Sequence, residues 1–600
     1  MKFLLLTAIF LIAPKLFAQQ DFLPHYPTEQ EKIIMEYLRL NPQPVDALVP
    51  DPPPGPVRTM AEWEELQALQ ITWTAQLPIL RQIVDYAQDE CLVYIICSDS
   101  NSVKTYLSSG GVPLVNLRFL ITSFNSIWCR DYGPWTVYSQ NIDTLRIIDW
   151  KYNRTARPQD DATPVFIANY MGVPIHQTLI APNDLVNTGG NFMVDGHGTG
   201  FASKLILSEN GPGNPYGVSV KSESQINQIM NAYMGITRYI KMDVLPYDQI
   251  HHIDMHMKLL DEETLLVGQY PPGVADGPQI ELNLQYVLNN FQTCFGKPYK
   301  VVRIPMPPHN GNYPPSGNYR TYTNSVFVNK TVIVPTYELQ YDTTALRIYR
   351  ESMPGYRVVG IDCNAIIPSL GAIHCISKEI GVSQPVFISH SAIRNTSNTS
   401  QPYEVKAYIK HKSGIASARM YWSLDTNSGF TQVNMTNIGD TFRANIPAQP
   451  MNTKIYYYIS ATSVSGRTVT KPLPAPSGNF RFTITNTTGI QPIAAGIPVR
   501  FSLYQNYPNP FNPVTKIKFD LAKSTNVKLR IFDLTGKEVL KVTDAFMNAG
   551  TYSYEWNASK MASGIYFYRL DAGEYSEVKK NDSRKINNGI TAVWLNNFYP

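Results

Sequence analysis

The sequence predicts an α/β domain made of five similar units, followed by two β-sandwiches. Three observations lead to this prediction. The chain has 600 residues, which is too long for a single hydrophobic core, so several domains are expected. Short polar clusters recur between strand-like segments through the first two thirds of the chain. Beyond Ile393, helical spacing gives way to alternating apolar and polar residues, which is typical of half-buried strands.

The N-terminus has the pattern of a secretory signal over residues 1–18. A lysine at position 2 precedes an apolar stretch, and a small residue, Ala18, occupies the cleavage point. The apolar stretch is too short to span a bilayer comfortably, and no later segment predicts a transmembrane helix. We therefore expect a protein exported through the periplasm, either secreted or held at the cell surface.

A Pro-rich arm follows over residues 19–54, with one short helix expected near Glu29–Arg39. The α/β domain then covers residues 55–393. Helical spacing over Met60–Gln88 leads into the apolar strand Cys91–Ile96, so the domain is expected to open with a helix that feeds a strand.

Five polar clusters divide this domain. Successive clusters lie 51 to 70 residues apart, each beside a strand-like segment and a turn. Similar steps suggest five supersecondary units around an axis, each of which contributes one polar residue near the middle. The alternative that spacing alone leaves open is an ordinary α/β protein with hairpins at such intervals. The clusters are Trp128-Cys129-Arg130-Asp131, Gly189-Gly190-Asn191, His252-Ile253-Asp254, Tyr322-Thr323-Asn324 and His374-Cys375.

Two β-sandwiches are predicted after the α/β domain. Residues 394–486 alternate between closely spaced turns, as in an immunoglobulin or fibronectin type sandwich, and contain no catalytic constellation. Residues 487–500 are a linker. Residues 501–600 contain a second, small sandwich, entered through Pro508–Pro513 because proline cannot occupy an interior strand.

Composition excludes several classes of protein. The net charge is +4 and no basic run or RNA-type aromatic motif occurs, so nucleic acid is not expected as a partner. Six cysteines are too few for a disulfide scaffold of this length. Neither a Cys-x-x-Cys pair nor a His-Glu-x-x-His helix is present, so nothing supports a zinc site.

The clusters together offer groups that suit a planar cation. Asp131 and Asp254 are carboxylates, and two carboxylates match the fork of donors on a guanidinium. Trp128 could offer this cation the face of its ring. His252 lies two residues before Asp254, so a strand would point both side chains to one face. Asn324 is a neutral hydrogen-bonding group.

Each of these residues also has a structural interpretation. Asp131 could be half of an ion pair with Arg130. His252 could be a satisfied core or surface histidine, and Asn324 a turn residue. Cys375 could supply a thiolate nucleophile if its neighbours stabilise the anion, whereas an unpaired cysteine is more often simply buried.

In this order, and over about residues 55–392, the clusters resemble the guanidine-modifying, or pentein, superfamily. More closely they resemble porphyromonad-type peptidylarginine deiminases and the related agmatine deiminases. The resemblance implies a five-bladed α/β propeller and hydrolysis of a guanidinium to a ureido group and ammonia. The blocks that carry it are Trp128–Trp135, Thr188–Gly196, His252–Asp254, Tyr322–Ser325 and Gly371–Cys375.

The resemblance implies a role for each catalytic candidate. Asp131 and Asp254 would clamp the guanidinium. Cys375 would attack it to give a covalent thiouronium, with His252 acting first as acid and then as base. Asn324 belongs to the implied catalytic set. The chemistry gives no task to a metal or an organic cofactor, although calcium-dependent animal relatives leave a structural cation open.

Substrate choice depends on a separate loop. Tyr152–Pro158 resembles the loop with which secreted members hold the α-carboxylate of a C-terminal arginine, and is one residue longer. Arg154 and Arg157 would grip the carboxylate. Trp128 and Asn191 complete the expected substrate-binding set. A solvated basic loop is the alternative interpretation.

Residues 501–580 resemble the C-terminal sorting domain of proteins exported by the type IX system of Gram-negative bacteria. Such domains usually close with an apolar, Lys-flanked strand, whereas here Lys579-Lys580 runs into a polar tail, residues 581–600. The resemblance implies the type IX machinery as a partner and leaves attachment to the outer-membrane surface open.

The sequence therefore predicts a secreted protein-arginine deiminase that produces citrulline, with arginine-containing peptides or proteins, preferably ending in arginine, as substrates. An agmatine or free-arginine deiminase is the first alternative. A catalytically silent surface adhesin that uses its sandwich is the second.

Overall fold

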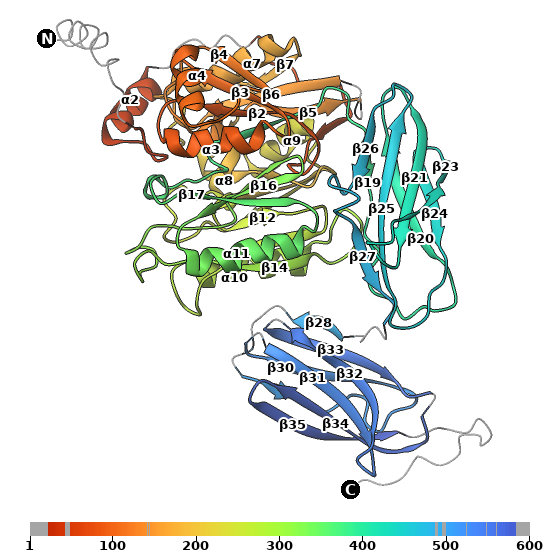
Figure 1. Cartoon of the computed structure of the whole chain (residues 1–600). Helices are drawn as coiled ribbons and strands as arrows, with labels where there is room; N and C mark the ends of the chain where they lie inside the picture. The colour runs from red at the N-terminus through yellow and green to blue at the C-terminus, as the bar shows by residue number, and fades with distance from the viewer. Residues whose placement is uncertain are drawn as a thin grey trace, which may run out of the picture. The chain divides into compact units, whose positions relative to one another are not determined.

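The computed structural model describes residues 22–583 except 42–47, 141, 143, 486–489, 495–497, 499, 524, 548 and 560. The predicted signal at 1–18 and the end of the tail, 584–600, lie outside the described residues. Two compact units are distinguished (Figure 1). The first comprises Met1–Ile393, Glu404–Ile446 and Tyr456–Arg481, and the second Arg394–Tyr403, Pro447–Ile455 and Phe482–Pro600, as far as these are described.

Five small sheets make up the described part of the chain between residues 57 and 381. Each contains an antiparallel strand pair, followed by a helix and a strand parallel to the second member of the pair. This repeat is the supersecondary unit that the spacing of the polar clusters suggested. The fold of this region is therefore mixed α/β.

The elements of these five sheets are as follows. The first pairs β18 (Lys378–Gly381) with β2 (Leu66–Thr72), then α3 (Leu77–Ala87), β3 (Leu92–Cys97), α4 (Ser100–Ser109) and β4 (Leu117–Ile121). The second contains β1 (Val57–Thr59), β5 (Trp135–Ser139), β6 (Thr144–Tyr152), α6 (Pro158–Asp161), α7 (Thr163–Met171), β7 (Ile175–Thr178) and β8 (Val186–Asn187). The third contains β9 (Met193–Val194), β10 (Thr199–Ser203), α8 (Leu205–Asn210), α9 (Glu223–Met234) and β11 (Arg238–Met242). The fourth contains β12 (Met257–Leu259), β13 (Thr264–Gln269), α10 (Gly277–Asn290) and β14 (Lys300–Pro305). The fifth contains β15 (Val326–Val328), β16 (Thr331–Thr336), α11 (Leu339–Ser352) and β17 (Arg357–Asp362).

The prediction of a helix over Met60–Gln88 is wrong for the first half of that range. Leu66–Thr72 is β2, which lies between β18 and β3, and only Leu77–Ala87 is helical. Nearly every residue of β2 is buried, including Gln70. A strand covered on both faces does not alternate, so its apolar spacing imitated a helix.

The arm contains the helix expected in it. Helix α2 runs over Glu29–Leu40 and begins with a capping box, in which Thr28 and Glu31 satisfy each other's backbone N–H groups. Arg39 lies in the last turn, where a cation favours the helix dipole.

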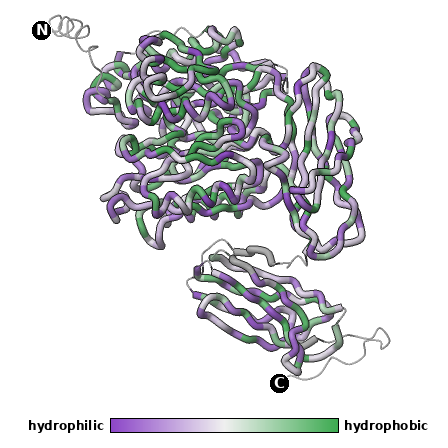
Figure 2. The backbone as a smooth tube through the Cα atoms, viewed as in Figure 1, coloured by the Kyte–Doolittle hydropathy of each residue, from purple (hydrophilic) through white to green (hydrophobic). Residues whose placement is uncertain are grey.

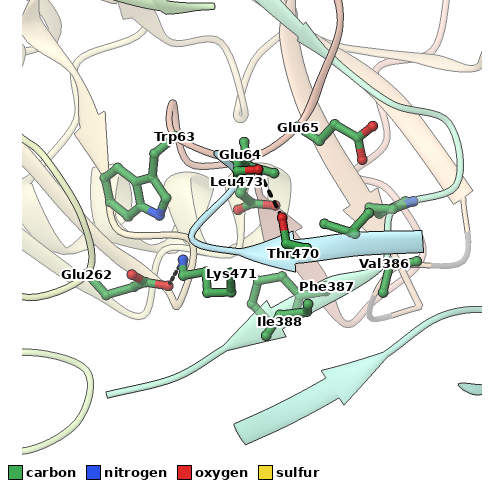
Figure 3. A pocket seen from close by; sticks show the side chains of 12 residues that line it. Trp63, Glu64, Glu65, Glu262, Val386, Phe387, Ile388, Thr470, Lys471 and Leu473 are labelled. Atoms are coloured by element: carbon green, nitrogen blue, oxygen red, sulfur yellow. Dashed lines mark hydrogen bonds and ion pairs between the residues drawn. The ribbon is translucent and has the colours of Figure 1, made fainter. Parts of the chain in front are cut away.

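A β-sandwich-rich region follows. Residues 387–483 form the sheets β19-β20-β24-β23 and β22-β21-β25-β26, with β27 beside β25. Figure 3 shows one place where this region meets the α/β part, at a pocket in which Lys471 donates to Glu262 over 2.7 Å. The strands are β19 (Phe387–Ser389), β20 (Tyr403–Lys410), β21 (Ile415–Ser423), β22 (Thr431–Asn434), β23 (Thr436–Ile438), β24 (Thr441–Ile446), β25 (Lys454–Ser463), β26 (Thr468–Lys471) and β27 (Phe480–Thr483).

The chain ends in a second pair of sheets, β28-β33-β30-β29 and β32-β31-β34-β35. Its last strand continues to Ser583, where the buried Asn581 accepts from Asn506 Nδ2 over 2.7 Å, so the polar segment after Lys580 begins as part of the sheet. The strands are β28 (Ile490–Ala494), β29 (Ser502–Leu503), β30 (Val514–Leu521), β31 (Thr525–Asp533), β32 (Glu538–Met547), β33 (Gly550–Asn557), β34 (Gly564–Ala572) and β35 (Tyr575–Ser583).

Hydrophobic stretches run along strands of the α/β part, whereas hydrophobic and hydrophilic residues are mixed along the strands that follow it (Figure 2). All six cysteines are free thiols. Within the described ranges, no helix has both the length and the apolar character needed to cross a bilayer.

Candidate active site

The five polar clusters occupy equivalent places in the fold. Each lies just before the first strand of its antiparallel pair: Asp131 before β5, Asn191 before β9, Asp254 before β12, Asn324 before β15 and Cys375 before β18. Each cluster thus immediately precedes the antiparallel pair of a repeated unit. This common position brings side chains of four clusters, and the backbone of the Gly189-Gly190-Asn191 cluster, to one region.

Asn324 organises the loop that carries the cysteine. Its Nδ2 lies 3.2 Å from Cys375 Sγ, and its Oδ1 accepts from the backbone N–H groups of Ala372 and His374, each at 3.1 Å. Gly371 in the same loop is needed for close packing, because a Cβ there would lie 2.4 Å from the Trp128 ring. The sulfur is fully buried and has a fixed donor.

Asp254 also approaches the sulfur. Its Oδ2 is 3.6 Å from Cys375 Sγ and 2.7 Å from Nδ1 of His374, whose Nε2 is 2.8 Å from Glu62 Oε1. Glu62 and His374 were not singled out by sequence reasoning as partners of a catalytic carboxylate. They lie 312 residues apart in the chain, and no local pattern links them.

His252 and Asp254 are not on a strand. Ile253–Met255 forms the short 3₁₀ helix η3, with His252 as its N-cap, so the expected strand geometry is wrong. His252 Nδ1 nevertheless lies 3.7 Å from Asp131 Oδ1, and its Nε2 lies 3.2 Å from the Thr188 hydroxyl. His252 and Asp254 therefore still reach the same buried region, beside Gly190.

The Gly189-Gly190 pair allows this approach. The backbone N–H of Gly190 donates to Asp131 Oδ1 over 3.2 Å. A Cβ at Gly190 would lie 2.4 Å from His252 Nδ1 and 3.2 Å from Asp254 Oδ2. Only glycine leaves room here for both side chains.

Burial and charge set the ionisation of the site. Burial and then the charges of Asp254 and Asp131 raise the pKa of the Cys375 thiol well above its ordinary value. Burial lowers the pKa of His252 to about 4. Burial alone would raise the pKa of Asp131, but His25 and His252 outweigh it and hold that pKa below its usual range. Without a bound cation the site thus combines a thiol, a neutral imidazole and a carboxylate.

A histidine of the arm lies inside the site. His25 is fully buried, its Nε2 is 2.5 Å from Asp131 Oδ2, and its ring stacks on Trp128 at 4.4 Å. Arg154 Nε donates to the His25 carbonyl over 3.1 Å, and Arg157 holds the carboxylate of Glu31. The expected substrate-binding residues therefore all contact the arm, except Asn191.

Two residues of the clusters point elsewhere. Asn191 exchanges hydrogen bonds with the backbone of Ser203 at the end of β10. Arg130 does not pair with Asp131: its Nη1 lies 2.7 Å from Glu379, and its Nε donates to the His374 carbonyl. Arg130 thus supports the cysteine loop from outside the site.

One group among the described residues has the spacing of metal ligands. Ligand atoms of His25, Asp131 and His252 all lie within 4.8 Å of one another. The contacts of His25 to Asp131 and Trp128 already account for its position, so the cluster alone does not indicate a metal.

The family model described as Porphyromonas-type peptidyl-arginine deiminase matches residues 58–380, more than half of the chain. The chain belongs to this family. As a member of the deiminase family it is a hydrolase that acts on C–N bonds. A second model, the secretion system C-terminal sorting domain, matches residues 505–581 and identifies a type IX sorting signal. The protein is therefore exported, to the medium or to the cell surface.

The relatives named below are distant: about a quarter of their residues are identical to those of this chain, over most of the relatives' own length. A protein of Vibrio parahaemolyticus named as an agmatine deiminase is 27% identical over 294 residues, 44% of this chain and 78% of its own. One of Lactococcus lactis, named likewise, is 24% identical over 289 residues, 44% of this chain and 77% of its own. The structure of agmatine deiminase from Enterococcus faecalis is 19% identical, with a TM-score of 0.47, over 54% of this chain and 95% of its own.

Proposed function

We propose that this deiminase hydrolyses the guanidinium of peptidyl arginine, preferably at a C-terminal arginine, to citrulline and ammonia. One observation above the others supports the hydrolysis of a guanidinium. Cys375 lies within 3.6 Å of both Asp254 and Asn324, in a region that Asp131, His252 and a flat aromatic face, Trp128, also reach. Guanidinium chemistry needs a nucleophile, two anions and an acid–base group around one planar cation.

The ionisation of the site is suited to a cationic substrate. A guanidinium between Asp131 and Asp254 offsets the two charges that raise the thiol pKa. Substrate binding therefore favours the thiolate of Cys375, and Asn324 Nδ2 remains its donor. The nucleophile is activated by the substrate it attacks.

The reaction then proceeds in two halves. The Cys375 thiolate adds to the guanidinium carbon to form a C–S bond and a tetrahedral adduct. The proton that the Cys375 thiol gives up passes to His252 and from there to one terminal nitrogen, the C–N bond breaks, ammonia leaves and a thiouronium remains. His252 next takes a proton from water, and the hydroxide adds to the same carbon. The C–S bond then breaks and the hydroxyl proton leaves to solvent, where ammonia takes it up, which gives the ureido product and the thiolate paired with protonated His252.

Recognition of a carboxylate is the reason to prefer a C-terminal arginine. Arg157 already holds a carboxylate, that of Glu31, through two hydrogen bonds of 2.7 and 3.1 Å. Agmatine has no such group. Because relatives of the chain are named agmatine deiminases, agmatine remains the second candidate substrate.

The architecture fits this proposal. We take the five sheets of residues 55–393 as the blades of a five-bladed propeller with the site at its axis, residues 394–486 as an immunoglobulin-like sandwich and residues 501–600 as the sorting domain, after the linker at 487–500. The repeated unit of the five sheets supports the first assignment.

The test compares three substrates: an arginine-ended peptide, the same peptide amidated at its C-terminus, and agmatine. The ureido product of each substrate is measured by colour and by the gain of roughly one dalton that deimination causes. We expect the arginine-ended peptide to react best, and Cys375→Ser to abolish product. Dominant turnover of agmatine, or equal product from Cys375→Ser, would reject the proposal.

A further inference from the structure

The arm places an imidazole where the proposed function needs a guanidinium. His25 stacks on Trp128 with 6° between the ring planes, and meets the ring of His252 edge-on at 5.0 Å. Its Nε2 contacts Asp131 Oδ2 at 2.5 Å, and its Nδ1 lies 2.8 Å from the carbonyl of Leu370 in the cysteine loop. A planar ring with N–H donors and an aromatic neighbour reproduces the contacts of a bound cation.

The arm's backbone is held on both sides of this histidine. The N–H of His25 donates to the Ser369 carbonyl over 3.1 Å, and its carbonyl accepts from Arg154. The Trp128 indole N–H donates to the Leu23 carbonyl over 2.9 Å. On the side of the arm these bonds use only backbone groups, so they fix the path of the segment without involving the arm's own side chains.

The carboxylate of Glu31 completes the match. Both of its oxygens accept from Arg157, one from Nε at 2.7 Å and one from Nη2 at 3.1 Å. Arg157 also donates to the Pro24 carbonyl over 2.8 Å. Glu31 is buried, as is Met35 one turn later in the same helix, and the other contact of the Glu31 carboxylate is the N–H of Thr28. The arm thus occupies both the cation position and the carboxylate position.

Each of these contacts would have to break before arginine entered. Asp131 cannot accept from His25 and a guanidinium in the same place, since His25 fills the space over Trp128. The Nε and Nη2 donors of Arg157, which would bind the substrate carboxylate, are likewise occupied by Glu31. The arm and an arginine substrate are therefore mutually exclusive.

We infer that residues 22–31 are an inhibitory plug, in which His25 mimics the substrate guanidinium and Glu31 its carboxylate, so that the exported enzyme is closed until the arm is displaced or removed. This inference rests on the proposed function for the identity of the substrate. The segment is tethered, so it competes at a high effective concentration. If the site is open for only a fraction of the time, apparent affinity and rate fall by that fraction.

The alternative is that His25 is itself a catalytic group. It touches Asp131 and approaches His252, so a role in proton transfer would also explain its position. The two interpretations predict opposite effects of its removal. A plug variant gains activity, whereas a catalytic variant loses it.

The experiment uses the full chain and two readouts. His25→Ala, Glu31→Gln and the double variant are compared with the parent and with Lys32→Ala, whose side chain pairs with Glu29 on the exposed side of the helix. The first readout is kcat/KM for the arginine-ended peptide. The second is the rate at which a haloacetamidine, a small guanidinium-like alkylating probe, labels Cys375, measured by mass spectrometry. The second readout needs no deimination.

We expect both readouts to rise by about 10-fold or more in the double variant and to stay unchanged in Lys32→Ala. A synthetic peptide of residues 22–41 should then inhibit the double variant competitively, and the same peptide with alanine in place of His25 should not. Faster labelling without any citrulline would support the plug and reject the proposed function. Unchanged or slower labelling and turnover in His25→Ala would overturn the plug.

Discussion

Asp254 Oδ2 lies 2.7 Å from His374 Nδ1, on a carboxylate that also faces Cys375 Sγ. The second nitrogen of His374 lies 2.8 Å from Glu62. This imidazole is therefore fixed between two carboxylates. Since both ring nitrogens of His374 are bound to carboxylates, those of Asp254 and Glu62, we regard it as a positioning residue that holds Asp254 in its orientation.

Replacing His374 should impair the clamp. We expect His374→Ala to lower kcat/KM by about 10- to 100-fold, because leaving a buried carboxylate without its hydrogen-bond donor costs roughly 1–3 kcal/mol. Added imidazole should restore part of the activity by filling the space, an effect that general destabilisation would not produce. His309→Ala, in a loop beside Asn310, is the matched control. Full activity of His374→Ala would show that Asp254 needs no support.

The donor on the sulfur leads to a prediction about pH. Asn324 Nδ2 lies 3.2 Å from Cys375 Sγ, where its hydrogen bond opposes the rise of the thiol pKa caused by burial and two carboxylates. Asn324→Asp keeps the acceptor for the loop but exchanges the donor for a third anion. The thiol pKa then rises, so the thiolate fraction at any given pH falls.

We expect the acid limb of the pH–rate profile for Cys375 alkylation to move up by at least about one pH unit in Asn324→Asp. The measurement is the labelling rate with iodoacetamide from pH 6 to 10, in the full chain and in a His25→Ala background. Asn310→Asp, on an exposed loop, controls for added charge. An unchanged profile would mean that the amide does not act on the sulfur.

The positions of the catalytic candidates could be predicted because each precedes the first strand of a repeated unit, and that repeat leaves a regular step in the sequence. His25, Glu62 and His374 could not be found in the same way. Their contacts join segments up to 312 residues apart, and the arm that carries His25 belongs to no repeat. Only tertiary packing brings them to Asp131 and Asp254.

Three sequence predictions meet features of the structure that local patterns do not show. Strand β2 is covered on both faces, so its buried residues do not alternate. The turn at Ile253–Met255 is a 3₁₀ helix, yet His252 and Asp254 still reach one region. Asn191 was predicted to bind substrate, but its amide bonds to Ser203 are local. Burial and local hydrogen bonding, which a single sequence does not reveal, decide these three cases.

Steric room at Gly190 should be essential. A Cβ there would lie 2.4 Å from His252 Nδ1, closer than any real contact allows, and 3.2 Å from Asp254. We expect Gly190→Ala to displace the imidazole and to lower kcat by at least about 100-fold, since small displacements of catalytic groups cost that much. Gly564→Ala, where an added Cβ meets open space, is the control. Retained activity in Gly190→Ala would place the proton transfer on a group other than His252.

A buried acid near the site should make stability depend on pH. Glu209, in α8, accepts from Asn153 Nδ2 over 2.7 Å, and burial raises its pKa from 4.5 to about 7. Below the unfolded pKa both states are protonated. Between about pH 4.5 and 7 the folded state binds more protons than the unfolded state, so the free energy of unfolding falls as pH rises, by roughly 3 kcal/mol in total. Above pH 7 the loss is complete.

Glu209→Gln removes this ionisation and keeps an oxygen for Asn153. We therefore expect the variant to melt a few degrees higher than the parent at pH 8 and at nearly the same temperature at pH 4, by scanning calorimetry. Glu351→Gln, at an exposed helix position paired with Arg347, should shift neither value by as much. A variant that is less stable than the parent at pH 8 would mean that Glu209 is ionised in the folded protein and stabilised by the nearby Arg154, whose charge acts in that direction.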